Sequence, residues 1–151
     1  WLMQDRNSTL GGTICLGGTN STGWSAPLSA SGSLAVSAND LTLTASFLPQ
    51  NSFGFYLNSR GPGFFQPAGS QGLVCINGGG IGRFVRPGEI QDSGAQGFTE
   101  LDIDLSDLPR PTGATSAVAG ERYAFQYWYR DTSSTGQPVS NFSAAVLVWL
   151  E

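Results

Sequence analysis

The chain has 151 residues, enough for one domain with a single core. Its net charge of -4, with seven basic residues that are all arginine, disfavours nucleic acid and anionic membranes as partners. Because histidine and lysine are absent, the chain cannot build a Ser-His-Asp triad, a Ser-Lys dyad, a Schiff base or a histidine-ligated metal site.

Alternation of apolar and polar residues with a period of two predicts strands, and no stretch keeps an apolar stripe at helical spacing. The clearest segments are LTLTASF, which places Leu41, Leu43, Ala45 and Phe47 on one face, and FTELDIDLS at 98–106. In chain order the predicted strands are 34–37, 41–47, 53–58, 73–76, 82–86, 98–106, 122–130 and 143–150.

About eight to nine short strands predict an all-β fold, a single-domain β-sandwich of jelly-roll or Ig-like type with long Gly/Pro-rich loops. A closed barrel is the second choice. Residues 1–12 form a predicted N-terminal extension, which is a candidate inter-subunit strand, and residues 13–151 form the sandwich domain. Asn77 and Gly78 indicate a hairpin turn, and 60–72 reads as a long loop.

The stretch RYAFQYWYRD, residues 122–131, holds five aromatic rings in ten positions. Strand parity separates a predicted core face from an outward face that carries Trp128 between Gln126 and Arg130. A covering loop, a sugar or a neighbouring subunit would each account for an outward tryptophan. The predicted core face consists of Tyr123, Phe125, Tyr127 and Tyr129.

Only two groups of acidic residues suggest a catalytic or metal-binding role. Asp92, Ser93 and Gly94 match the short signature of aspartic proteases, but glycines and polar residues surround them, so we predict a turn. Calcium could be held by Asp102, Asp104 and Asp107, although solvated strand carboxylates are the simpler interpretation. We therefore expect no catalytic residue and no cofactor.

Two cysteines, Cys15 and Cys75, lie far apart in the chain. A single disulfide is their simplest use, and two buried free thiols are the alternative. Three sequons are candidate glycosylation sites, each expected in a turn or at a strand edge where a glycan is tolerated: Asn7, Asn20 and Asn141.

Both ends of the sequence are unusually apolar. Leu147 and Trp149 make the second face of the last predicted strand apolar, so this strand needs cover on both sides. Exposed apolar ends favour aggregation unless they close the domain's own sheets or dock on another copy, and we predict subunit contacts by Trp1, Leu2, Met3, Leu147 and Trp149. Strand addition between identical copies would produce a homopolymer.

The two ends of the sequence also indicate the cellular compartment. The longest apolar run, 144–150, is too short to span a bilayer, and no signal peptide opens the sequence. A first residue other than methionine indicates a processed or excised chain, so we expect secretion to the extracellular space or the cell surface.

Several segments taken together resemble a glycine-rich β module that recurs in large secreted proteins of planctomycete-type bacteria. The resemblance covers roughly 13–148 and rests on CLGGTNSTG, LSASGSLAVSANDLTLTASFLPQNSFGFYLNS, GSQGLVCINGGGIGRF and AGERYAFQYWYRDTSSTGQPVSNFSAAV. It implies an extracellular setting and a disulfide between Cys15 and Cys75, and it supplies no catalytic residues. The chain departs from the module at Tyr123, where tryptophan is usual, and at its VLVWLE end.

These observations predict a secreted, non-enzymatic structural protein, the subunit of an extracellular filament or surface assembly. The alternative is a carbohydrate-binding or adhesive module of a larger secreted protein, with polysaccharide as its partner. Its candidate ligand or contact platform would consist of Trp24, Phe64, Phe65, Trp128 and Arg130.

Overall fold

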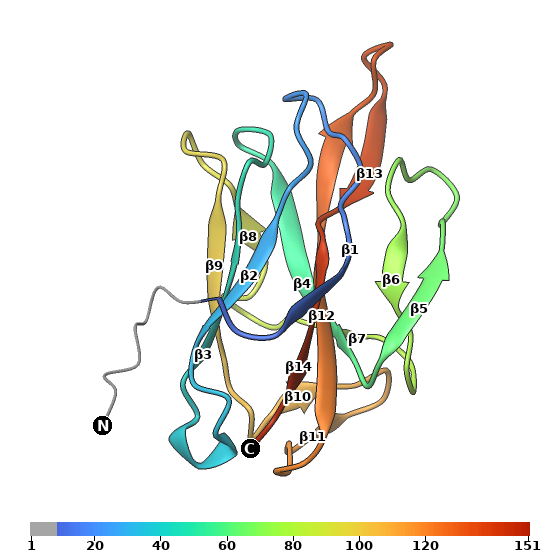
Figure 1. Cartoon of the computed structure of the whole chain (residues 1–151). Coiled ribbons are helices and arrows are strands. Elements are labelled where there is room, and N and C mark those ends of the chain that lie inside the picture. Colours follow the sequence, from blue (N-terminus) through green and yellow to red (C-terminus); the bar gives the residue numbers. More distant parts are fainter. Residues whose placement is uncertain (1–8) are drawn as a thin grey trace.

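The structure is a computed structural model that describes residues 9–151, and its antiparallel sheets stack in three layers (Figure 1). The middle layer is a seven-stranded sheet. Its strands follow the order β1-β14-β12-β4-β7, with β13 beside the end of β12 and β8 beside the start of β4. Their bounds are β1 Gly12–Cys15, β4 Phe53–Ser59, β7 Gly82–Arg83, β8 Gln91–Asp92, β12 Arg122–Thr132, β13 Pro138–Phe142 and β14 Ala145–Trp149.

A three-stranded sheet packs on the inner face of this layer. Its strands are β2 Leu28–Gly32, β3 Leu41–Ala45 and β9 Thr99–Ile103. The alternation predicted for β3 is present: Leu41, Leu43 and Ala45 are buried, and Thr42 and Thr44 are partly exposed. The main core therefore lies between the two sheets, which confirms the predicted all-β sandwich.

The third layer is a hairpin on the outer face of the middle sheet. Its strands are β5 Pro62–Phe65 and β6 Val74–Ile76. A second, smaller core fills the space beneath the hairpin, where Val74 and Ile76 pack with Leu57, Ala124 and Phe142. Short pieces complete the fold: the 3₁₀ turn Val36–Ala38 and the strands β10 Leu108–Pro109 and β11 Ala114–Thr115.

The inner face of β12 is the aromatic core that strand parity predicts. Tyr123, Phe125, Tyr127 and Tyr129 have no exposed surface. Their rings continue into the neighbouring strand, because Tyr56 of β4 lies 4.6 Å from Tyr127 between ring centroids. Aromatic rings bury more area than other side chains, so this row contributes much of the hydrophobic stabilisation of the domain.

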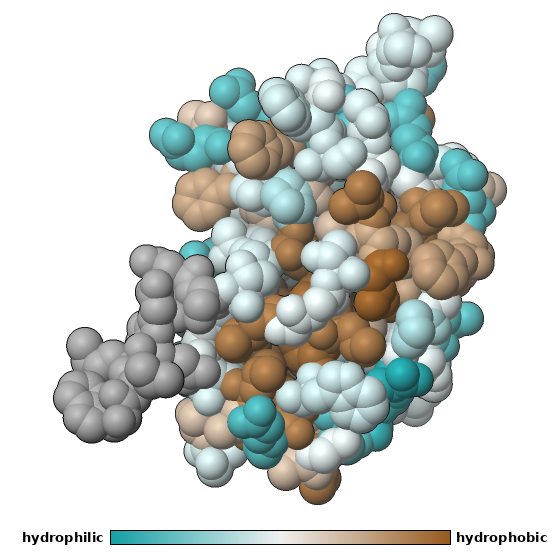
Figure 2. All heavy atoms as spheres, in the orientation of Figure 1, coloured by the Kyte–Doolittle hydropathy of each residue, from teal (hydrophilic) through white to brown (hydrophobic). Residues whose placement is uncertain are grey.

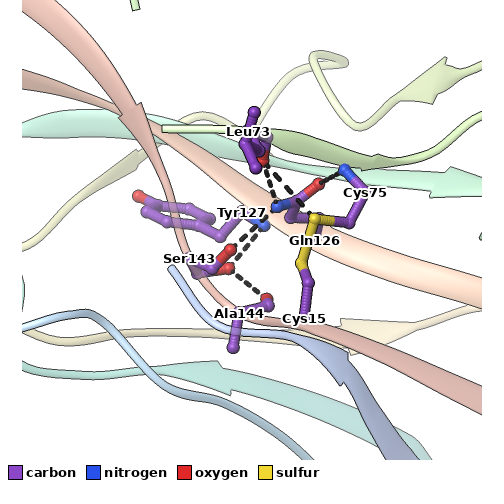
Figure 3. The surroundings of a disulfide bond; sticks show 7 residues. All are labelled: Cys15, Leu73, Cys75, Gln126, Tyr127, Ser143 and Ala144. Carbon is purple, nitrogen blue, oxygen red and sulfur yellow. Dashed lines mark hydrogen bonds between the residues drawn. A yellow bond between two sulfur atoms is a disulfide. The ribbon is translucent and has the colours of Figure 1, made fainter. Parts of the chain in front are cut away.

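The opposite face of β12 is also covered. Gln126 is fully buried, and its amide nitrogen donates to the Leu73 and Ser143 carbonyl oxygens at 2.9 and 2.8 Å. Its amide oxygen accepts from the Cys75 N–H at 2.9 Å, so one side chain joins the hairpin to the sheet (Figure 3). Each polar atom of this amide thus has a partner, as burial requires.

Cys15 and Cys75 form a disulfide with a Cα–Cα distance of 6.4 Å. It joins β1, an edge strand of the middle sheet, to β6 of the hairpin (Figure 3). The disulfide is therefore confirmed, and the alternative of two free thiols is wrong.

The C-terminal strand is an interior strand, so of the two alternatives for this end the structure shows closure of the domain's own sheet. β14 lies between β12 and β1, with Leu147 paired to both Ala124 and Gly12. Leu10 bridges to Ala30 of β2, so the segment that contains β1 passes from one sheet to the other and covers this side of the sandwich. Leu10 and Gly12, from the predicted extension, thus pair with the sandwich.

Three local predictions are also wrong. Residues 36–38 form a 3₁₀ turn where a strand was predicted, because the Val36 N–H bonds to the Glu151 carbonyl oxygen and Asn39 is left-handed. Asn77 and Gly78 do not close a hairpin: β6 pairs with β5, whereas β7 pairs with β4. The predicted loop 60–72 contains β5. Residues 9–151 form fourteen strands, several of only two residues, where about eight to nine were expected.

No helix among residues 9–151 has the length and apolar character that a membrane crossing requires.

Candidate functional site

Several loops lie at one end of the sandwich, at the top of Figure 1, and four of them surround the candidate site. These four loops follow β1, β3, β8 and β12, and they comprise residues 16–27, 46–52, 93–98 and 133–137. Loops held on a rigid β scaffold commonly carry binding residues, because they are exposed and tolerate sequence change.

Two of these loops present a pair of exposed aromatic rings, which we call the aromatic platform: Trp24 and Phe47. Their exposed fractions are 65% and 58%, and their ring centroids are 5.9 Å apart. Beside them a shallow apolar hollow of about 270 Å³ is lined by Leu16 and Pro27. Exposed aromatic side chains that gather around a hollow are typical of contact and ligand sites.

Phe47 was predicted to face the core and instead points outward. β3 ends at Ala45, and Phe47 has a φ of 52°, in the left-handed region that bulky residues seldom adopt. Such a conformation costs on the order of 1–3 kcal/mol and persists only where neighbouring contacts hold it. The alternation LTLTASF contains no signal for this reversal.

Asn20 holds both loops of the aromatic platform. Its side-chain nitrogen donates to the Phe47 carbonyl oxygen at 2.9 Å and to the Tyr129 hydroxyl at 3.1 Å. Its side-chain oxygen accepts from the Thr22 N–H at 2.9 Å. Burial raises the pKa of Tyr129, so this phenol stays neutral as an acceptor for Asn20.

Asp131 and Asn141 complete the support below the loop that carries Trp24. The Asp131 carboxylate accepts from the Ser21 N–H at 3.2 Å and from the Asn141 side-chain nitrogen at 3.3 Å. That nitrogen also donates to the Thr19 carbonyl oxygen at 3.1 Å. Asn20, Asp131 and Asn141 all belong to the segments that carry the planctomycete-type resemblance, and the fold brings them together.

This network changes the interpretation of the sequons. Asn20 opens a turn and Asn141 lies on β13, as expected, but both side chains are buried and hydrogen-bonded, so neither is open to a glycan in this fold. Asn7 lies outside the described residues.

The other predicted platform residues lie at a second place, beside the β5–β6 hairpin. Phe65 and Trp128 line one hollow there, and Phe64 is exposed next to it. Trp128 is half-buried: its ring lies 4.8 Å from the Phe55 ring, and the Arg130 guanidinium lies 5.1 Å from its centroid. Trp128 is thus partly covered by its own chain, while Trp24 is open.

The acidic residues considered from sequence lie apart from the aromatic platform. Asp92 is exposed at the end of β8, and its carboxylate accepts from the N–H of Gly94, where the following turn begins, at 2.8 Å. Asp102 accepts from the Thr42 hydroxyl, Asp104 from Asn39 and Ser106, and Asp107 pairs with Arg86. Within residues 9–151, no three acidic or cysteine side chains gather as metal ligands would.

Of the predicted subunit-contact residues, the structure describes only the two on β14. Trp149 is 58% exposed, with Arg122 stacked 5.8 Å from its ring centroid, and Leu147 is half-buried. Trp1, Leu2 and Met3 lie outside the described residues.

Comparison with known proteins finds no matching family model, no matching curated protein and no matching solved structure. The resemblance to the planctomycete-type module therefore stays a prediction from the sequence.

Proposed function

We propose that this protein is a secreted, non-enzymatic carbohydrate-binding or adhesive module that holds its ligand on the aromatic platform. The observation that carries the proposal is the exposed Trp24–Phe47 pair, in which a buried asparagine holds Phe47 in a left-handed backbone conformation. A pre-ordered aromatic surface loses little side-chain entropy when a flat ligand stacks on it. The apolar faces of sugar rings fit such a surface.

Composition and the disulfide support the remaining parts of the proposal. Without histidine or lysine the chain lacks the residues that most hydrolases need. Disulfides form and persist in oxidising compartments, so the Cys15–Cys75 bond fits an extracellular location.

Retention on insoluble polysaccharides tests the platform. We expect the protein to bind at least one of cellulose, chitin and xylan, and we expect Trp24→Ala and Phe47→Ala each to weaken binding about tenfold, since a buried aromatic contact contributes 1–2 kcal/mol or more. Trp149→Ala is the matched control, because Trp149 is comparably exposed but lies on β14. Unchanged binding by both platform variants, or retention on none of the polysaccharides, would contradict the proposal.

Self-assembly is a second candidate function, and the edge of the middle sheet favours it. Within the described residues β1 is hydrogen-bonded to β14 on one side, and its other side is an edge. Figure 2 shows a broad hydrophobic area on the face where β1 and β14 lie, and a hollow of about 360 Å³ there is lined by Ile14, Leu34, Leu147 and Trp149.

Strand addition at this edge would give an extracellular filament or surface layer. Sedimentation velocity and electron microscopy of the purified protein test it: fibres or concentration-dependent oligomers support assembly, and a monomer at every concentration excludes it.

A further inference from the structure

A second hollow, separate from the aromatic platform, lies between the β5–β6 hairpin and the outer face of the middle sheet. We call it the hairpin groove. It has a volume of about 270 Å³. Its walls are apolar, with aromatic and aliphatic side chains together with one cationic and one hydroxyl side chain, and the lining includes Phe55, Phe65, Trp128, Phe142, Arg83 and Ser140.

The pairing of the strands places these side chains on one face. Trp128 of β12 pairs with Phe55 of β4 and with Phe142 of β13, so three rings lie side by side. Arg83 of β7 pairs with Leu57, the next outward residue of β4 after Phe55. The groove floor is therefore a continuous apolar surface with a guanidinium at its edge.

The hairpin that forms the other wall is fixed. Cys75 is joined to β1 by the disulfide, and its N–H donates to the buried Gln126 oxygen at 2.9 Å. Phe65 is held by its pairing with Val74. The groove is consequently part of the folded structure and does not need a ligand to form.

Charge distinguishes this groove from the rest of an acidic protein. Arg83 is its one ionisable lining residue, and no carboxylate lines it. Arg83 is exposed and forms no ion pair within residues 9–151, whereas Arg60 and Arg86 pair with acidic side chains. Arg130 adds a second cation beside the groove, stacked on Trp128.

We propose that the hairpin groove binds a medium-chain fatty acid, with the alkyl chain on the rings and the carboxylate on Arg83. A guanidinium binds a carboxylate through two parallel hydrogen bonds, and an aromatic wall suits a hydrocarbon body. A sugar would need more polar partners than Arg83 and Ser140 provide. A water molecule occupies about 30 Å³ in the liquid, so the groove of 270 Å³ holds about nine heavy atoms. This size corresponds to a medium-chain fatty acid.

Three probes of equal chain length test this inference: octanoate, 1-octanol and octylammonium, each titrated into the disulfide-bonded protein. Backbone amide chemical shifts and tryptophan fluorescence report binding. We expect octanoate to bind at least about tenfold more tightly than either other probe, because a charge-assisted bidentate contact is present for octanoate alone. We expect the largest shifts in β4, β6, β12 and β13.

Arg83→Gln should reduce octanoate affinity to that of octanol and leave octanol unchanged. Arg122→Gln is the control, since Arg122 is exposed on the same strand as Trp128 but stacks on Trp149. Trp24→Ala should also leave octanoate binding unchanged, which separates this site from the aromatic platform. Three results would each overturn the inference: no octanoate binding, equal or tighter binding of another probe, or an Arg83→Gln variant that keeps the octanoate preference.

Discussion

At position 20 one buried amide joins the loop that carries Trp24 to the loop that carries Phe47. Its nitrogen has two acceptors, the Phe47 carbonyl oxygen and the Tyr129 hydroxyl, and its oxygen accepts from the Thr22 N–H and hydroxyl. A buried amide with all of its partners present is costly to remove, because each partner would lose its hydrogen bond. The exposed platform thus depends on an interior residue.

Asn20→Ala should lower the free energy of unfolding by about 1–3 kcal/mol, since it leaves the Phe47 carbonyl and the Thr22 N–H without their partner. Urea unfolding followed by fluorescence measures this change. Ser21→Ala is the control: Ser21 contributes only its backbone N–H to Asp131, so a change within about 0.5 kcal/mol is expected. Equal stability of both variants would show that Asn20 does not hold the loops.

Among the elements, the β5–β6 hairpin depends most on a single covalent bond. It lies on the outer face of the middle sheet, and its links to that sheet are the disulfide, the Gln126 amide and the small core around Val74 and Ile76. The disulfide closes a loop between residues 60 positions apart in sequence. It therefore restricts the unfolded chain as well as fixing the hairpin.

The double variant Cys15→Ser/Cys75→Ser should unfold with a free energy about 4 kcal/mol lower than the oxidised protein, the value expected from chain entropy for a loop of this length. Urea unfolding with and without reductant measures the difference, and reductant should destabilise the wild type but leave the double variant unchanged. Hydrogen exchange should accelerate most in β6, because only non-covalent contacts, the Gln126 amide, the small core and the loop hydrogen bonds to Ser140, then hold the hairpin. A wild-type protein insensitive to reductant would contradict this assignment.

For the whole molecule, the four tyrosines are all in the core. Burial raises the pKa of Tyr127 to about 12 and also raises the pKa values of Tyr56, Tyr123 and Tyr129. In the unfolded chain their pKa is about 10. Above this pH the unfolded state releases phenolic protons that the folded state retains, so stability is complete below about pH 10 and falls as pH rises toward about 12.

The free energy of unfolding should therefore fall by about 1.4 kcal/mol per pH unit for each tyrosine that stays protonated in the fold. Urea unfolding at about pH 9 and about pH 11 measures the slope, and tyrosinate absorbance should rise together with unfolding. The slope of stability with pH can be assigned to tyrosine because the chain has no histidine or lysine and its cysteines are paired. Tyrosinate absorbance that rises near pH 10 while the protein stays folded would exclude buried phenols.

The sequence by itself determined the all-β class and the inner face of β12. Both follow from alternation along one strand: Leu41, Leu43 and Ala45 are buried on one face of β3, and every second residue from Tyr123 to Tyr129 lies in the core. Side chains of a strand alternate between its two faces whatever the rest of the chain does, so local pattern is sufficient. With only two cysteines a single disulfide was the simplest expectation from the sequence, and the structure decided between it and two free thiols.

The tertiary structure alone decided what covers each strand and which aromatic rings stay exposed. Pairing of β14 between β12 and β1 made the apolar C-terminal strand an interior one, and the hairpin covered Gln126 and part of Trp128. Phe47, predicted to be in the core, is held outward by Asn20, which is 27 positions away in sequence. Such contacts join segments distant in the chain, and a periodic pattern within one strand carries no information about its neighbours.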